Sequence, residues 1–177
     1  MKANSHPAIL NIIKEQGIGI DAVSPNEIQV ALDAGIAPYK ILYTGNYESE
    51  EDLEQAFEQG VKINLDNGSS LNKLLKVGKP EILSFRINPG KGQGKYEHIT
   101  TGGEKAKFGI PLEKALKAYE KALNAGIKKF GVHTFLGSGI LDEGHFAEVV
   151  ELLAEKARVI RSELGIKFDF FDIGGGF

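Results

Sequence analysis

The sequence predicts an α/β fold, a TIM-type (β/α)8 barrel of which about six βα units are present. Helical patterns alternate strictly with short apolar runs, and such alternation leads to parallel strands joined by right-handed crossovers. Most of these runs are apolar throughout, as in a sheet that is covered on both faces. A glycine cluster follows the last run, where barrels commonly place phosphate, whereas no Gly-x-Gly-x-x-Gly follows an early run. The barrel is therefore favoured over an open doubly wound sheet, which stays the alternative.

Each expected helix carries apolar residues at helical spacing and ends near a glycine, the usual C-cap residue. These apolar faces lie within residues 9–13, 28–32, 53–57, 71–75, 112–123 and 146–164, and the glycines that follow them are Gly17, Gly35, Gly60, Gly78, Gly126 and Gly165. The expected strands are the apolar runs 18–23, 41–44, 61–65, 82–87, 130–136 and 168–173. Ser24-Pro25-Asn26-Glu27 predicts a capping box, in which the Glu27 side chain accepts from the N-cap amide.

Length and composition limit the possible functions. At 177 residues the chain is shorter than the about 250 residues of a closed barrel, so we expect one domain, residues 1–177, truncated at both ends. The net charge of −3 includes no basic stripe that would bind nucleic-acid phosphates. There is no cysteine, no metal-ligand spacing among the histidines, no apolar run near the roughly 18 residues of a membrane span, and no signal-peptide pattern. We therefore expect a cytoplasmic protein that binds neither nucleic acid nor a membrane.

Catalytic side chains of such barrels come from the carboxyl ends of several strands. The residues at these ends are Lys2, Asp21, Asn46, Asn64, Asp66, Arg86, Asn88, His133, Ser138, Gly174, Gly175 and Gly176. Three successive glycines let several backbone N–H groups approach an anion, which predicts a phosphate site. A lysine can form a Schiff base with an aldehyde cofactor when burial or neighbouring charge activates its amine. Asp21 lies inside an expected covered strand, where an acid needs a partner, and a lysine from the adjacent strand would supply one.

Several of these residues also have a simpler interpretation. Lys2 by itself is a solvated charge near the terminus, and Arg86 points either into the barrel mouth or along the surface. A single buried histidine such as His133 is usually a satisfied core group. Residues 90–95 are rich in glycine and lysine but lack the Gly-Lys-Ser/Thr ending of a P-loop, so they are interpreted as a loop. Ser138 lacks a Gly-x-Ser-x-Gly elbow, so we do not expect a serine nucleophile.

In their order along the chain, these segments resemble the barrel domain of the fold-type III pyridoxal-phosphate decarboxylases, which is similar to that of alanine racemase. The motifs that carry the resemblance are Lys2-Ala-Asn, Gly19-x-Asp21-x-x-Ser24-x-x-Glu27, Gly45-Asn46, Asn64-x-Asp66, Arg86-Ile-Asn-Pro89, Lys107-Phe-Gly109, His133-x-Phe135-x-Gly-Ser138 and Asp172-Ile-Gly174-Gly-Gly176. Each motif alone is weak, but their order and spacing together are specific. The diaminopimelate decarboxylases are the branch of the family that the chain resembles most.

The resemblance implies a cofactor and a set of residues that hold it. Lys2 would hold pyridoxal 5'-phosphate as a Schiff base, with Asp21 beside it as counter-ion. The cofactor would be lined by Arg86, His133 and Phe135, and its phosphate bound by Ser138, Gly174, Gly175 and Gly176. The implied activity is that of an amino-acid carboxy-lyase, most similar to diaminopimelate decarboxylase of lysine biosynthesis. The implied assembly is a homodimer or another homo-oligomer.

One departure from the family bears on the substrate. The family's second histidine, which stacks on the cofactor ring, is Phe135 here, and a phenyl ring stacks but neither hydrogen-bonds nor transfers a proton. The alternatives are therefore a carboxynorspermidine, ornithine or arginine decarboxylase and an amino-acid racemase. Because the segments that complete the family's active site, including a C-terminal β-domain, are absent, a non-catalytic fragment that binds the cofactor is another alternative. A phosphate-binding barrel without this cofactor is the last.

Overall fold

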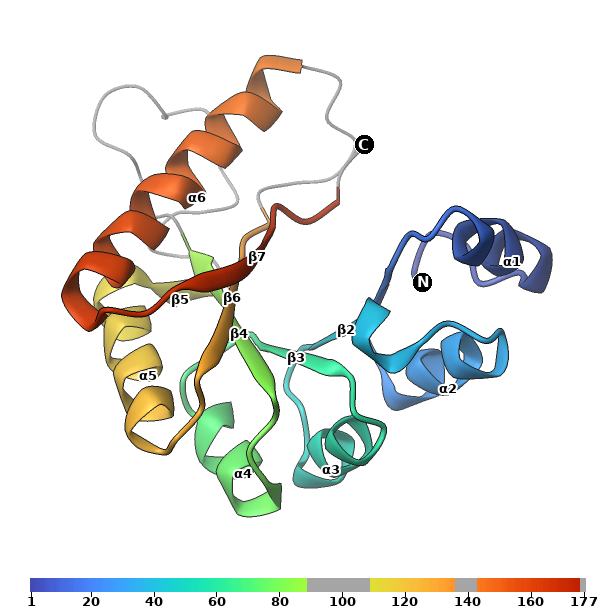
Figure 1. The fold of residues 1–177 in the computed structure, drawn as a ribbon, viewed down its shortest axis with the longest axis horizontal. Helices are drawn as coiled ribbons and strands as arrows, with labels where there is room; N and C mark the ends of the chain where they lie inside the picture. Colours follow the sequence, from blue (N-terminus) through green and yellow to red (C-terminus); the bar gives the residue numbers. More distant parts are fainter. Residues whose placement is uncertain (89–108, 136–142, 176–177) are drawn as a thin grey trace.

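The structure is a computed structural model that describes residues 1–88, 109–135 and 143–175, in which helices and strands alternate (Figure 1). The strands are β1 (Ile20–Ala22), β2 (Ile41–Gly45), β3 (Lys62–Leu65), β4 (Ile82–Asn88), β5 (Ile110–Pro111), β6 (Lys129–His133) and β7 (Phe168–Asp172). The helices are α1 (Pro7–Glu15), α2 (Pro25–Asp33), α3 (Glu50–Glu58), α4 (Ser70–Val77), α5 (Leu112–Asn124) and α6 (Glu143–Leu164), and a short 3-10 helix, η1 (Pro38–Lys40), precedes β2.

The main sheet is parallel, and its strand order follows the sequence, β1-β2-β3-β4-β6-β7. A doubly wound sheet would reverse its order at a switch point, and the described strands contain no such reversal. The six α-helices lie along one side of the sheet, and the strands curl away from them (Figure 1). The sheet is open, with β1 and β7 as its two edges. These features confirm the predicted incomplete barrel.

The core lies between the curled sheet and the helices that cover its convex side. Every residue of β2 is buried, as expected of a strand that is covered on both faces. Tyr119 of α5 is completely buried and meets three aromatic rings edge-on, those of Phe85, Phe130 and Phe168, at 4.8, 5.6 and 5.5 Å between ring centroids. Edge-on aromatic contacts of this kind stabilise the packing of α5 on β4, β6 and β7.

All six predicted strands and six predicted helices are present, with bounds that differ by up to three residues. Two short elements were not predicted. The 3-10 helix η1 leads into β2, and the two-residue strand β5 pairs in parallel with the end of β4 through Ile87 and Ile110. Both are too short to leave a periodic signal in the sequence.

The capping box predicted at α2 is half formed. The Ser24 hydroxyl accepts from the Glu27 N–H at 3.3 Å, as expected. The Glu27 carboxylate, however, accepts from the Val23 N–H at 2.7 Å, so the prediction that it binds the N-cap amide was wrong. The longer Glu side chain reaches the amide one residue before the cap. A reciprocal capping box forms instead at α3, where Ser49 is paired with Asp52.

Candidate functional site

The polar residues of the site lie on the concave side of the sheet, near the carboxyl ends of its strands. In β4, Phe85 packs against Tyr119 on the helix side, so its neighbour Arg86 points to the concave side. Arg86 is in register with His133 of β6, and His133 is in register with Asp172 of β7. Three adjacent strands therefore bring Arg86, His133 and Asp172 side by side.

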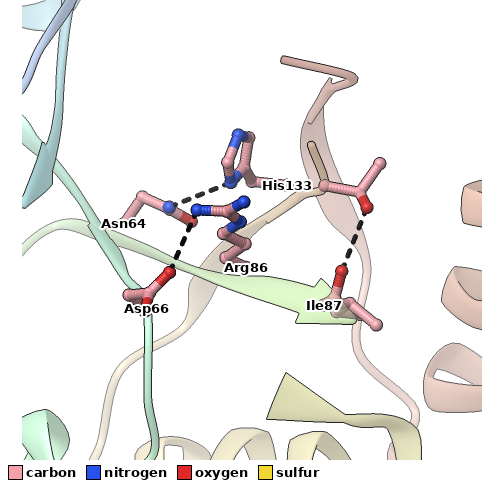
Figure 2. A network of polar contacts seen from close by, with 6 residues as sticks. Asn64, Asp66, Arg86, Ile87 and His133 are labelled. Atoms are coloured by element: carbon pink, nitrogen blue, oxygen red, sulfur yellow. Dashed lines mark hydrogen bonds and ion pairs between the residues drawn. The ribbon is translucent and has the colours of Figure 1, made fainter. Parts of the chain in front are cut away.

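A chain of two hydrogen bonds holds the His133 ring, and Figure 2 shows the one with Asn64. Asn64 Nδ2 lies 3.2 Å from His133 Nδ1, and Ser84 Oγ lies 2.5 Å from Asn64 Oδ1. All three side chains are buried. Burial is the largest cause that lowers the pKa of His133 to about 4, because desolvation disfavours the charged imidazolium. The ring is therefore neutral at physiological pH.

Arg86 points inward rather than along the surface. Its Nη1 lies 3.3 Å from Asp66 Oδ1, and the two side chains are 13% and 7% exposed (Figure 2). Burial lowers the pKa of Arg86 and raises that of Asp66, and each charge opposes the shift of its partner. A hydrogen bond from the Gly109 backbone also favours the Asp66 carboxylate. Since guanidinium groups stay protonated in proteins, Arg86 provides a fixed positive charge at the site.

Phe135 connects Arg86 to the glycine turn that follows β7. Its ring centroid lies 5.4 Å from Arg86 Cζ, within cation–π distance. Gly174 has a φ of +75°, and a Cβ at this position would come within 2.6 Å of Phe135 Cδ2 and 2.8 Å of the Thr134 carbonyl oxygen. Only glycine fits such a position. The glycine turn is thus pressed against the Phe135 ring.

The backbone of the glycine turn is only partly available to a ligand. The Gly174 N–H donates to Asp172 Oδ1 at 2.8 Å. A Cβ at Gly175 would meet no atom within 4 Å, so its backbone borders open space. Gly175 is exposed, whereas an anion that binds here would compete with Asp172 for the amide of Gly174.

Asp21 and Lys2 lie at the other edge of the sheet. The Met1 ammonium donates to the Asp21 carbonyl oxygen at 2.8 Å, which places the start of the chain beside β1. The side chains of Lys2 and Asp21 are exposed. Surrounding protein still desolvates the Asp21 carboxyl, which is the largest cause that raises its pKa to about 6, and Asp172 adds repulsion. Water at the exposed part of the carboxylate limits the size of this change but not its direction.

The structure thus gathers four of the predicted residues, Arg86, His133, Phe135 and Gly174, and places Gly175 next to them. Two others, Ser138 and Gly176, lie outside the described residues, as do residues 90–95. Sequence reasoning assigned no role to Asn64, Asp66 or Ser84. For Asn64 and Ser84 the available signal was a polar residue within a covered strand, because such a group needs a hydrogen-bond partner.

Comparison with known proteins decides the family. Residues 1–177 match the family described as "Pyridoxal-dependent decarboxylase, pyridoxal binding domain". The chain belongs to this family. The predicted family, the barrel fold and the pyridoxal phosphate cofactor are thereby confirmed.

Individual relatives within the pyridoxal-dependent decarboxylases are named diaminopimelate decarboxylase. The chain is 44% identical to that of Methanothermobacter thermautotrophicus over 176 residues, which cover 99% of this chain and 41% of the relative. It is 42% identical to that of Thermoplasma acidophilum, covering 99% of this chain and 43% of the relative. The crystal structure of the Helicobacter pylori enzyme complexed with L-lysine superposes with a TM-score of 0.83 at 32% identity, covering 98% of this chain and 45% of that one.

The chain therefore spans less than half the length of the curated relatives it matches. No helix in the described part of the chain has the length and the apolar character that a membrane span requires.

Proposed function

We propose that this chain is the pyridoxal phosphate-binding barrel of an amino-acid decarboxylase, most similar in activity to diaminopimelate decarboxylase. The observation that carries the proposal is the convergence of Arg86, His133 and Asp172 from adjacent strands beside a turn that only glycine can form. A barrel enzyme places its reactive groups at this end of the sheet. The names of the relatives indicate the reaction and the substrate.

The residues present fit this cofactor. The Gly175 backbone borders open space and suits a phosphate, while the guanidinium of Arg86 supplies a positive charge nearby. Phe135 offers an aromatic face, and the neutral His133 ring lies in the same row of side chains as Arg86. We propose that these residues line the cofactor together with Ser138, and that Gly174, Gly175 and Gly176 form the phosphate-binding turn.

Lys2 and Asp21 have the catalytic roles in this proposal. Lys2 attaches the cofactor covalently through its amine, and Asp21 lies beside it as counter-ion. When bound, pyridoxal phosphate supplies the electron sink for the carbanion that remains after CO2 leaves. The protein residues orient the substrate, hold the protons at defined atoms and exclude water from the concave side of the sheet.

Covalent attachment tests the proposal. The chain is saturated with pyridoxal phosphate, reduced with borohydride and digested, and the modified lysine is identified by mass spectrometry. We expect modification at Lys2 and its loss in Lys2→Ala. The matched control is Lys117→Ala, an exposed lysine of α5, which should leave the modification at Lys2 unchanged. Modification spread over surface lysines, without preference for Lys2, would contradict the proposal.

A second candidate reaction is racemisation or the decarboxylation of another amino acid, such as ornithine, arginine or carboxynorspermidine. The observation that favours it is Phe135, which packs against Arg86 and carries no hydrogen-bonding group. Parallel assays of CO2 release and of racemisation, with the full-length protein, separate these reactions. Release of CO2 from diaminopimelate supports the first candidate.

We further propose that the protein is a cytoplasmic homodimer or another homo-oligomer. The edge strands β1 and β7 each pair on one side only within the described sheet, and Phe171 of β7 is 52% exposed. Open sheet edges and exposed aromatic side chains favour association. Sedimentation velocity tests the assembly, and a monodisperse monomer would contradict it.

A further inference from the structure

We propose that Asn64, held in turn by Ser84, is a positioning residue that keeps the His133 ring in the tautomer with its proton on Nε2. The use of this proton by the cofactor or substrate rests on the proposed function, whereas the tautomer itself does not.

The direction of the hydrogen bonds follows from the Ser84 hydroxyl. A hydroxyl has one proton to donate. Among the described residues, the Ser84 hydroxyl donates it to Asn64 Oδ1 at 2.5 Å. The Oδ1 atom of Asn64 is therefore the one that faces Ser84, so the amide nitrogen faces His133 Nδ1 at 3.2 Å. An amide NH2 group only donates, and Nδ1 must then accept with its lone pair. The ring proton is left on Nε2.

The opposite orientation of the amide is less favourable. A flipped Asn64 would accept from a protonated Nδ1 and would donate to Ser84, whose hydroxyl proton would then have no acceptor among the described residues. Asn64 and Ser84 are fully buried and His133 is 4% exposed, so water cannot readily replace the lost partner. Burial also favours the neutral ring, in which only one nitrogen carries a proton.

The tautomer gives His133 a defined chemical role. Nε2 lies on the side of the ring away from Asn64 (Figure 2), and His133 is in register with Arg86, which points to the concave side of the sheet. The chain thus presents a neutral N–H donor next to a guanidinium. Position 135, where the family carries its second histidine, is a phenylalanine here and cannot donate. His133 Nε2–H is therefore the imidazole donor that this site offers to an oxygen of the cofactor or substrate.

Nitrogen NMR spectroscopy tests the tautomer in the ligand-free chain. Replacing the other three histidines, His6→Gln, His98→Gln and His145→Gln, leaves His133 as the only imidazole. Long-range proton–nitrogen correlation distinguishes a protonated ring nitrogen from one that carries a lone pair. We expect a single species with the proton on Nε2 near neutral pH. A proton on Nδ1, or an averaged signal from both tautomers, would overturn the proposal.

Two substitutions test the dependence on Asn64. An aspartate at this position can only accept, so Asn64→Asp should move the ring proton to Nδ1 and weaken pyridoxal phosphate binding about tenfold, the value of one good hydrogen bond. Ser84→Ala should yield a mixture of tautomers because the amide can then flip. The matched control, Asn11→Asp on the exposed side of α1, should change neither. An Nε2 proton that persists on a neutral ring, with Nδ1 unprotonated, in Asn64→Asp would overturn the positioning role. If NMR shows the expected tautomer but the cofactor does not attach at Lys2, the proposed function is rejected and the positioning role of Asn64 is not.

Discussion

Arg86 of β4 donates to Asp66, the residue that follows β3, across a distance of 3.3 Å. The pair ties the carboxyl ends of two neighbouring strands together and is largely shielded from water. The ring centroid of Phe135, which follows β6, lies 5.4 Å from Cζ of the same guanidinium. Asp66 and Phe135 thus restrict the guanidinium from two directions and keep it at the site.

Removing the acid of this pair should destabilise the fold. Asp66→Ala leaves a guanidinium that is 13% exposed without its carboxylate, and breaking one side of a buried ion pair costs about 3 kcal/mol. We expect the free energy of unfolding, measured by urea denaturation, to fall by this amount. The same substitution removes one of the contacts that restrict the guanidinium and should weaken pyridoxal phosphate binding.

The exposed pair of Lys129 and Glu81 is the matched control. These side chains are 56% and 80% exposed and lie 2.6 Å apart. Exposed pairs of this kind are screened by water and contribute little to stability. Glu81→Ala should leave the urea midpoint nearly unchanged. Equal losses of unfolding free energy in Asp66→Ala and Glu81→Ala would show that burial does not strengthen the ion pair of Arg86 with Asp66.

The two described glycines of the phosphate turn should respond differently to alanine. Gly174→Ala forces a side chain into the left-handed region, at φ +75°, and against Phe135, so we expect a loss of at least about 1 kcal/mol in stability and a clear loss of cofactor affinity. Gly175→Ala meets open space and should change stability by less than about 0.5 kcal/mol. Urea denaturation and a pyridoxal phosphate titration measure both effects. Similar losses in the two variants would contradict this view of the turn.

Asp21 should make stability depend on pH. Its pKa rises from 3.8 to about 6 on folding, chiefly because the surrounding protein desolvates the carboxyl. Between these values the folded chain holds a proton that the unfolded chain has lost. The contribution of Asp21 is therefore fully present at low pH and is lost as the pH rises through about 6. Asp21→Asn, which cannot ionise, should gain stability relative to the natural chain over this range.

Urea denaturation of both proteins between about pH 4 and pH 8 measures this difference, and the span brackets both pKa values. A carbon NMR titration of the Asp21 carboxyl checks the pKa directly. A difference in stability that stays constant across the range, or a titration at the ordinary value, would show that water at the exposed carboxylate removes the effect of desolvation.

The fold was predictable because its signals are local. Each helix ends near a glycine, and Gly17, Gly35 and Gly60 adopt the positive φ expected of C-caps. Alternation along the expected strand 130–136 also placed His133 and Phe135 on one face correctly, although β6 itself ends at His133, as their contacts with Asn64 and Arg86 show. In both cases the information lies within a few residues of the chain.

The pairings between strands were not predictable in the same way. Asp66 meets Arg86, and Ser84 meets Asn64, across 20 residues of sequence in each case. Which side chains meet depends on the register of parallel strands, and a slip by one residue would turn every side chain to the other face. The sequence shows that polar residues occupy covered strands, but the partner of each depends on the three-dimensional register.

Tyr119 offers a last test, of the packing that supports the site from behind. Its hydroxyl donates to the Gly131 carbonyl oxygen at 2.7 Å and accepts from the Phe85 N–H at 3.3 Å, next to the irregularity in the pairing of β6 with β7. Tyr119→Phe keeps the ring contacts but leaves both backbone groups buried without their partner, which costs about 1–3 kcal/mol. Urea denaturation should show this loss, whereas Tyr39→Phe, at a side chain 66% exposed, should show almost none.

Because Gly131 and Phe85 adjoin the strand segments that carry His133 and Arg86, Tyr119→Phe should also increase hydrogen exchange of the amides of β6. Unchanged stability and exchange would mean that the aromatic contacts alone hold these strands in register.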